Sequence, residues 1–325
     1  MIRQRLIGGF LLLAAILIGI GAIARHIQLD SPFEPPARVF DSMTPHLLLA
    51  GIVLALLAIA AGARITGAVV LVAGVVAAGV FATDHVERSL PLVAPGPDDL
   101  RVVFFNALTS DDIARARLVA AAIEAADPDV AIIAEGKMMS PLMPELRAHY
   151  PYQVGCNPDC EIVVLSRILL TTSEIRSMGA LKKNRYTRLV LDLPQKVGQW
   201  GELDLIAAHI SKPWITGVVD VELGQLARWL NLIRQPLILV GDFNSAPWSY
   251  GLRNLIGWTG IRALRWPVAT WPVPARRFGV PIDNVFVRGG ARIVAIQPFG
   301  DDLGSNHRGF LLRIRPPFAP GQPAG

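Results

Sequence analysis

The chain has 325 residues, a formal net charge of +5 and a mean hydropathy of +0.43. This length can hold two domains, but a positive mean hydropathy is unusual for a soluble protein. The apolar excess lies before residue 93, so the chain divides into a membrane part and a globular part. The positive charge is spread thinly without a long Lys/Arg run, which argues against a dedicated nucleic-acid binder.

Three apolar stretches in the first part are long enough to cross a membrane as helices, namely residues 6–24, 47–63 and 65–82. A helix rises ~1.5 Å per residue, and the hydrocarbon core of a bilayer is ~30 Å thick. Only Arg64 separates the second stretch from the third, which predicts a tight helical hairpin. We therefore expect residues 1–88 to form a membrane domain with three transmembrane helices.

The positive charges near the spans set the expected orientation. Arg3 and Arg5 precede the first span and Arg64 lies in the hairpin turn, so these faces are expected in the cytoplasm. Arg25 and Arg38 in the intervening loop argue the other way. Three crossings place the globular domain on the periplasmic or extracellular side of the cytoplasmic membrane. A cleaved signal peptide is the alternative for the first stretch, although no clear small-residue cleavage site follows it.

The remainder of the chain has the pattern of a linker, a domain and a tail. Residues 89–99 combine Pro, Gly and acidic residues, as linkers do. Residues 100–315 have ordinary globular composition and are expected to form one domain. Residues 316–325 are expected to be a disordered tail.

Apolar runs in the globular part predict many strands and few helices. Strands are expected over residues 100–105, 130–134, 162–165, 187–193, 203–208, 237–240, 282–287 and 310–314. Helices are expected over residues 111–126, 219–233 and 248–255. These helices are too few for a doubly wound parallel sheet. We expect an α+β fold, a four-layer α/β/β/α sandwich in which two mixed sheets pack face to face with helices outside.

The chain has two cysteines, Cys156 and Cys160, separated by three residues. A small disulfide loop is expected if the domain faces an oxidising compartment. Two unpaired thiols are the alternative, because a bridge across so short a loop needs particular geometry. A zinc site would need more ligands than this segment offers.

The strongest chemical signal is Gly241-Asp242-Phe243-Asn244, directly after the apolar run 237–240. The carboxylate and the amide stand two residues apart, hence on the same side of an extended segment. Such a pair can orient a water molecule while holding a phosphate oxygen. A structural role is the alternative, since Asp and Asn are common turn formers.

Polar residues also stand at the ends of the other expected strands. They are Asn106, Glu135, His209, Asp283 and the run Ser305-Asn306-His307. Each alone has a structural alternative: a cap for Asn106, a solvated loop acid for Glu135, and a hydrogen-bonded core histidine for His209. Their joint placement predicts one site on the rim of a sheet core.

Two further patterns are less specific. Ser305 and His307 do not indicate a serine hydrolase, because the sequence contains no G-x-S-x-G turn. Arg276 and Arg277 lie in the Trp- and Pro-rich segment 266–281, where they could line the substrate entrance and bind anionic groups. A solvated loop is the alternative for this pair.

An ordered set of motifs resembles the endonuclease/exonuclease/phosphatase superfamily, which has the deoxyribonuclease I-like fold. The motifs are FFNAL, IIAEG, AHISKP, LVGDFNSAP, PIDNVFV and GSNHRGF. The resemblance covers residues 100–315, and the spans ahead of it resemble a membrane-anchored bacterial subgroup. It implies a metal-dependent hydrolase of phosphate esters.

The resemblance also implies a role for each matched residue. Glu135 would be the principal ligand of Mg²⁺ or Mn²⁺, with Asn106 close to it. Asp242 would orient or deprotonate the attacking water, and Asn244 would hold a phosphate oxygen. Hard oxygen ligands without thiolates favour magnesium or manganese over zinc.

The implied phosphate-binding groups are histidines. His307, supported by Asp283, would bind the phosphate and stabilise its developing charge, and His209 would act from the opposite side. This arrangement fits phosphoryl transfer, in which the protein mainly positions groups and neutralises negative charge.

One residue departs from the family pattern. The residue before His307 is usually an aspartate, whereas this chain has Asn306. An amide oxygen can ligate a cation but brings no negative charge, so Asn306 stays a candidate ligand with a lower expected metal affinity. A second metal site becomes less expected.

The leading hypothesis is hydrolysis of a phosphate ester by metal-activated water outside the cytoplasmic membrane. The substrate could be nucleic acid, a phospholipid headgroup or a small metabolite, and no protein partner is indicated. A catalytically silent anion-binding or scaffold domain is the second hypothesis, because of Asn306. A nonspecific nuclease is the third, and it would require a broad basic face.

Overall fold

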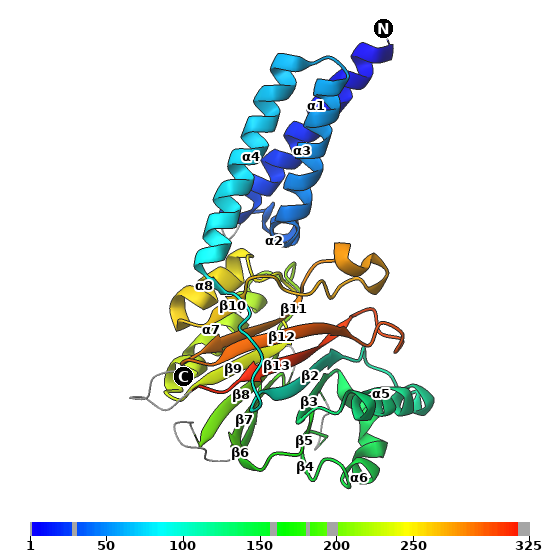
Figure 1. The fold of residues 1–325 in the computed structure, drawn as a ribbon, viewed down its shortest axis with the longest axis vertical. Coiled ribbons are helices and arrows are strands. Elements are labelled where there is room, and N and C mark those ends of the chain that lie inside the picture. Colours follow the sequence, from blue (N-terminus) through cyan, green and yellow to red (C-terminus); the bar gives the residue numbers. More distant parts are fainter. Residues whose placement is uncertain (1, 28–30, 157–160, 180–182, 194–200, 318–325) are drawn as a thin grey trace.

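The computed structural model describes residues 2–27, 31–156, 161–179, 183–193 and 201–317. A bundle of long helices stands on one side of a two-sheet domain, and the N-terminus lies at the far end of the bundle (Figure 1). Because Cys160 lies outside the described residues, its disulfide to Cys156 stays a prediction.

The bundle consists of α1 (Ile2–Ile23), α3 (Thr44–Ala60) and α4 (Arg64–Glu87). The short helices η1 (Ala24–His26) and α2 (Glu34–Ser42) lie at its base, next to the globular domain (Figure 1). Glycines let the long helices approach closely. A Cβ at Gly51 or Gly74 would come within 3.0 Å of the Ile18 side chain, so these positions favour residues without side chains.

Two helical stretches of the described chain, residues 2–26 and 64–87, are long and apolar enough to cross a membrane. They contain the first and third expected spans. The second expected span, 47–63, falls on α3, which reaches spanning length only together with α2 across a bend of 76°. Two candidate spans are therefore clear, and the third depends on this bent pair.

The globular domain contains two mixed sheets. The order of the first is β1 (Ser89–Leu90), β10 (Arg262–Leu264), β11 (Asp283–Arg288), β9 (Leu237–Asp242), β8 (Glu202–His209), β7 (Tyr186–Asp192) and β6 (Leu170–Arg176). The order of the second is β12 (Arg292–Phe299), β13 (Gly309–Arg315), β2 (Leu100–Asn106), β3 (Val130–Ala134), β5 (Ile162–Ser166) and β4 (Tyr152–Val154). Both combine parallel pairs, β8 with β9 and β2 with β3, with antiparallel ones.

Helices cover the outer faces of both sheets, while the main core lies between the sheets. α7 (Val218–Leu232) and α8 (Tyr250–Thr259) pack on the first sheet. α5 (Ile113–Ala126), η2 (Gly136–Leu142) and α6 (Met143–Leu146) pack on the second. The expected α+β architecture with two packed mixed sheets is confirmed.

Local signals set the connection that leads toward the site from β2. α5 begins after Asp112, whose carboxylate accepts hydrogen bonds from the backbone N–H groups of Ala114 and Arg115 at 2.9 and 3.3 Å. It ends at Asp127, in a left-handed conformation directly before Pro128. An N-cap carboxylate and a terminal proline delimit a helix in this way. The helix connects β2 to β3, which pair in parallel.

Several elements differ from expectation. The strands β4, β6, β10 and β12 were not expected, and residues 89–90 of the expected linker form β1, which pairs in parallel with β10. Residues 318–325 of the expected tail lie outside the described residues. The unexpected strands are short, or lie at or near sheet edges with many exposed side chains, so they lack a continuous apolar run.

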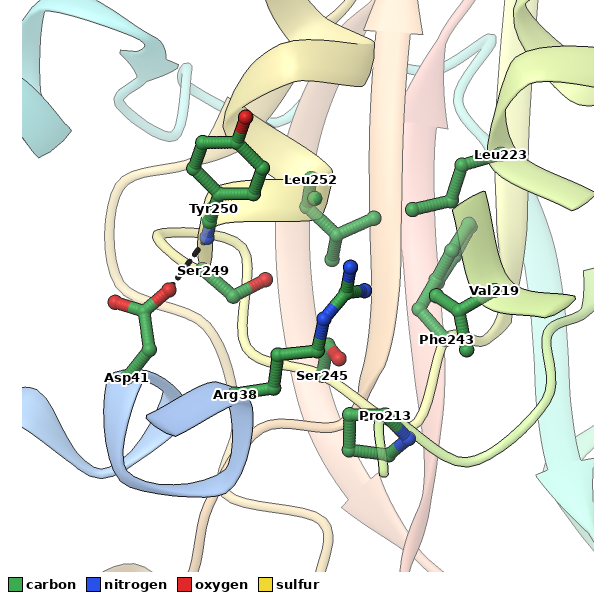
Figure 2. A pocket seen from close by; sticks show the side chains of 11 residues that line it. Arg38, Asp41, Pro213, Val219, Leu223, Phe243, Ser245, Ser249, Tyr250 and Leu252 are labelled. Carbon is green, nitrogen blue, oxygen red and sulfur yellow. Dashed lines mark hydrogen bonds between the residues drawn. The ribbon is translucent and has the colours of Figure 1, made fainter. Parts of the chain in front are cut away.

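The helix α2 fastens the bundle to the globular domain. Figure 2 shows the Asp41 carboxylate accepting a hydrogen bond from the backbone N–H of Tyr250, at 2.5 Å. Tyr250 is the first residue of α8, where free N–H groups favour an anion. Arg38 extends from the same helix and pairs with Asp220 in the first turn of α7, at 2.6 Å. One helix therefore clamps the N-terminal ends of two others.

Further contacts extend the clamp. The Ser42 carbonyl accepts a hydrogen bond from Nε1 of Trp248 at 3.0 Å, and its hydroxyl accepts one from the backbone N–H of Ala246 at 3.1 Å. From α4, the ring of His85 packs edge-on against Trp248 and donates to the carbonyl of Arg265 at 2.9 Å. The bundle base and the domain share one packed interface.

Asp41 is 2% exposed. Burial raises the pKa of its carboxyl to about 6, against the lowering effects of the hydrogen bond from Tyr250 and the charges of Arg25, Arg253 and Arg38. The ionised clamp is thus held at the expense of desolvation.

We expect Asp41→Asn to remove a pH dependence of stability. The folded chain binds this proton more tightly than the unfolded chain, whose pKa is 3.8, so wild-type stability falls as the pH rises through about 6. The rise of the pKa from 3.8 to about 6 corresponds to a loss of on the order of 3 kcal/mol in the free energy of unfolding once Asp41 is ionised in both states. Thermal unfolding of both proteins should be measured near pH 3.8 and again above pH 6. Between these two conditions the wild type should lose stability relative to Asp41→Asn. A constant difference would contradict the buried charge.

Candidate active site

Six of the residues selected from the sequence line one cavity of about 550 Å³ at the rim of the two sheets. They are Glu135, His209, Asp242, Asn244, Asn306 and His307. Two others stand directly behind them, Asn106 at the end of β2 and Asp283 at the start of β11. Segments far apart in the sequence therefore converge on this cavity.

Glu135 follows β3 in a left-handed backbone conformation, with φ 51°. Its carboxylate accepts hydrogen bonds from the backbone N–H and the hydroxyl of Thr109 at 2.9 and 2.8 Å, and from Nδ2 of Asn106 at 3.4 Å. Burial opposes ionisation, but the Thr109 hydrogen bonds, the charge of His209 and the Asn106 amide lower the pKa of Glu135 to about 2. The site holds this carboxylate ionised and oriented.

Asp242 ends β9 and is buried. One carboxylate oxygen accepts the backbone N–H of Asn244 at 2.8 Å, and the other accepts Nδ2 of Asn106 at 2.9 Å. The preceding Gly241 permits the close approach of β8, because a Cβ there would lie 1.9 Å from the carbonyl oxygen of Ala208. The glycine of the motif thus lets the two central parallel strands bring their last residues together.

His307 faces Asp242 from the segment before β13. Its Nδ1 donates to Asp283 at 3.0 Å, and its Nε2 lies 3.9 Å from a carboxylate oxygen of Asp242. Burial lowers the pKa of His307, but the charge and hydrogen bond of Asp283 and the charges of Asp242 and Glu135 outweigh burial and raise it to about 9. The imidazole is therefore a cation at neutral pH.

Asp283 is itself fixed by its surroundings. The hydroxyl of Thr270 accepts hydrogen bonds from the backbone N–H groups of Ile282 and Asp283, each at 3.0 Å. Burial and the charge of Asp242 raise the pKa of Asp283, while His307 and Thr270 lower it. Thr270 was not selected from the sequence, because a single threonine in a loop carries no pattern.

His209 approaches Asp242 from β8. Its Nε2 lies 3.6 Å from a carboxylate oxygen of Asp242, and its Nδ1 lies 2.7 Å from Glu161. Arg185, which also lines the cavity, pairs with Glu161 at 2.9 Å and donates to Nε2 of His209 at 3.3 Å. Sequence reasoning missed Arg185 and Glu161, since neither belongs to a recognised motif.

The basic pair expected at the entrance lies elsewhere. Arg276 and Arg277 are exposed and are not among the residues that line the cavity. The arginine and lysine residues that line it in the described chain are Arg185 and Lys212. Lys212 could have been found, because it belongs to the AHISKP motif.

The oxygen-rich part of the site fits a hard divalent cation. The carboxylates of Glu135 and Asp242 accept hydrogen bonds from the same Asn106 nitrogen, so one oxygen of each faces a common point. Carboxylate oxygens suit Mg²⁺ or Mn²⁺. The Oδ1 of Asn106 accepts the N–H of Leu108 at 2.9 Å, so this amide would have to turn to become a ligand. A second group of possible ligand atoms, from Asp242, Asp283 and His307, lies within 4.8 Å.

A family model described as the Endonuclease/Exonuclease/phosphatase family matches residues 103–307. The match covers more than half of the chain, and its bounds contain every residue placed in the cavity from the globular domain. The chain therefore belongs to the endonuclease/exonuclease/phosphatase family, whose members hydrolyse phosphate esters. The family expected from the motifs is confirmed.

Solved structures agree on the fold. An endonuclease/exonuclease/phosphatase from Beutenbergia cavernae is 21% identical, with a TM-score of 0.52 over 68% of this chain and 72% of that chain. The human Nocturnin catalytic domain with bound sulfate is 16% identical, with a TM-score of 0.53 over 70% of this chain and 97% of that one.

A third similar structure is that of D. rerio TDP2 in complex with a single-strand DNA product. It is 17% identical and has a TM-score of 0.52 over 67% of this chain and 99% of that chain. A comparison with curated protein sequences gave no match. At these identities the likeness shows the fold alone.

We expect Thr270→Val to destabilise the domain more than a matched substitution away from the site. The valine leaves the buried N–H of Asp283 without an acceptor, which costs about 1–3 kcal/mol. It also removes one of the two acceptors of the Ile282 N–H, which keeps the carbonyl of Val280 at 3.1 Å. Thr259→Val is the control, because the buried Thr259 hydroxyl only donates to the carbonyl of Leu255 within α8. Thermal unfolding should show the larger loss for Thr270→Val, and equal losses would contradict this role.

Proposed function

We propose that the protein is a membrane-anchored, divalent-metal-dependent phosphoesterase that hydrolyses a phosphate ester by activated water. The observation that carries the proposal is the convergence of Glu135, Asp242 and His307 on one cavity. It pairs an acidic, oxygen-rich half with a cationic imidazole. This combination suits a reaction in which an anionic phosphate is held while a water is deprotonated.

The proposed metal ligands are Glu135, Asn306 and, once its amide has turned so that Oδ1 takes the place of Nδ2, Asn106. Mg²⁺ or Mn²⁺ held there supplies Lewis-acid polarisation of a phosphate oxygen. Asn306 lines the cavity and is exposed, so it can reach a ligand but contributes no charge to it.

Asp242 is the proposed acceptor of the proton from water. In this step the water oxygen bonds to phosphorus, the water proton passes to Asp242, and the P–O bond to the alcohol breaks. Asn244 would hold a phosphate oxygen beside it. Its Nδ2 uses one N–H on the carbonyl of Ile210 at 2.9 Å, which leaves the second N–H for the substrate.

His307 is the proposed partner of the phosphate on the other side of Asp242. As an imidazolium held by Asp283, it would stabilise the charge of the phosphate and return a proton to the departing alkoxide. His209 and the neighbouring guanidinium of Arg185 would face the phosphate from the opposite side.

Wild-type chain with Mg²⁺ or Mn²⁺ is expected to hydrolyse bis(p-nitrophenyl) phosphate. Glu135→Ala and Asp242→Ala should each lower kcat/KM by ~100-fold or more, because they remove a metal ligand and a general base. Glu145→Ala is the matched control, since Glu145 is an exposed carboxylate in a surface ion pair with Arg117. Chelation with EDTA should abolish the activity.

Wild-type turnover no greater than that of the two alanine variants would contradict the proposal. Asn306→Asp distinguishes the remaining alternatives, because it restores the charge that the family pattern has at this position. A gain in turnover at lower metal concentration would place the defect in metal affinity. An inactive Asn306→Asp protein that still binds phosphate would favour the anion-binding or scaffold alternative.

We propose further that the bundle spans the cytoplasmic membrane three times and places the domain on its outer side. Arg3 donates to the carbonyl of Ala61 at 2.7 Å. The N-terminal end of α1 and the turn before α4, which carry the positive charges, therefore lie together. They lie at the end of the bundle away from the domain (Figure 1). Exposed apolar side chains such as Val69, Val72 and Val80 on α4 suit a lipid environment.

The proposed orientation predicts the behaviour of reporters fused after the last residue. Alkaline phosphatase, which needs an oxidising compartment, should be active there, while a fluorescent protein that matures only in the cytoplasm should be dark. The same reporters fused after residue 63, in the turn before α4, should behave in the opposite way. Fluorescence from the C-terminal fusion would contradict the outward placement.

A further inference from the structure

The lining of the candidate cavity combines polar and apolar side chains. The catalytic candidates are polar, whereas nearly half of the residues that line the cavity are apolar. The apolar wall of the cavity includes Val39, Met43, Trp214, Trp271, Val280 and Ile282. A small polar phosphate ester leaves such a wall without a partner, whereas an amphiphile would cover it.

The helical bundle supplies part of this wall. Val39 lies on α2, and Met43 stands between α2 and the first residue of α3. Met43 also packs against the buried cluster that contains Val280 and Ile282. The wall is therefore continuous from the catalytic rim to the point where the apolar helix α3 begins.

The segment between β10 and β11 carries exposed aromatic residues, and it contacts the start of α3. Trp266, Trp271 and Phe278 are 77%, 40% and 69% exposed. The carbonyl of Phe278 accepts a hydrogen bond from His46, in the first turn of α3, at 3.0 Å, and this segment lies on the bundle side of the domain (Figure 1). Aromatic rings gather at membrane interfaces.

The charges of the cavity favour a single phosphate over a nucleic-acid backbone. Arg185 is 4% exposed on its side chain and is paired with Glu161, so Lys212 is the more accessible cation of the lining. A nucleic-acid groove needs a row of exposed cations to follow successive phosphates. A site for one phosphate beside an apolar wall suits a lipid that carries a phosphate ester.

On the basis of the proposed function, we propose that the substrate is a membrane lipid, a phosphate ester whose hydrocarbon chain packs on the apolar wall. The ester enters from the bilayer at the base of the bundle, with its phosphate between Asp242 and His307. Water adds to phosphorus, the P–O ester bond breaks, and the alcohol leaves with a proton.

The test uses the full chain in phosphatidylcholine nanodiscs with p-nitrophenyl methyl phosphate and p-nitrophenyl octyl phosphate. These diesters share the leaving group and differ only in the hydrocarbon chain. We expect kcat/KM to be ~10-fold or more higher for the octyl ester, because each methylene that leaves water for the wall is favourable.

Substitutions separate the wall from simple partition into the bilayer, which raises the octyl rate in every variant alike. Trp214→Ala and Met43→Ser should each lower the octyl-to-methyl ratio by ~3-fold or more. Trp258→Ala is the matched control, because Trp258 lies on α8 outside the cavity and is 56% exposed, compared with 51% for Trp214. It should keep the wild-type ratio.

The outcomes separate the two proposals. A ratio near one, or a ratio that Trp214→Ala and Met43→Ser leave unchanged, overturns the lipid inference and leaves the phosphoesterase intact. Faster hydrolysis of a single-stranded oligonucleotide than of the octyl ester overturns it in favour of a nuclease. No turnover of either ester or of bis(p-nitrophenyl) phosphate ends the proposed function, and the lipid inference with it.

Discussion

The site depends on one amide that holds two carboxylates from different sheets. Nδ2 of Asn106, at the end of a strand in the second sheet, donates to Glu135 and also to Asp242, which ends a strand in the first. The carboxylates of Glu135 and Asp242 are close enough to share one donor nitrogen, so their negative charges repel each other unless hydrogen-bond donors and cations offset the repulsion. Thr109, His209 and His307 supply that compensation. The packed sandwich is thus required for the site, since neither sheet alone contains both carboxylates and their donors.

The second constraint is the clamp between α2 and the helices α7 and α8. It buries Asp41 at the start of α8 and pairs Arg38 with Asp220. Burying the Asp41 carboxylate and burying the Arg38–Asp220 ion pair each cost desolvation free energy. A flexible tether between bundle and domain would not require this cost. The bundle therefore also contributes to the candidate site, because the clamp fixes Met43 at the wall of the cavity.

The sequence predicts the central strands and the residues at their ends for one physical reason. A strand buried on both faces needs a continuous apolar run, so the polar residue that ends the run, such as Asn106, Glu135 or Asp242, stands out. Edge strands such as β6 (LTTSEIR) expose one face and resemble loops. The helix α2 escapes notice because Pro35 and Pro36 read as breakers, although proline suits the first turn of a helix.

The supporting shell of the site could not be predicted in the same way. Thr109, Glu161, Arg185 and Thr270 act through contacts that form only when separate segments meet. None ends a long apolar run, and none is unusual for a loop. Sequence patterns identify groups that strands place, whereas groups placed by tertiary packing need coordinates.

The exchange that gives Asn306 changes the charge balance of the cavity. Glu135 and Asp242 face His307, Arg185 and Lys212 around the same space. An aspartate at position 306 would add a third negative charge to the lining, next to the cation of His307. The amide leaves the lining less negative, which would weaken binding of the proposed metal but would also weaken repulsion of an anionic phosphate. In the proposed enzyme, substrate binding would therefore depend more on the protein cations and the apolar wall, and less on the metal.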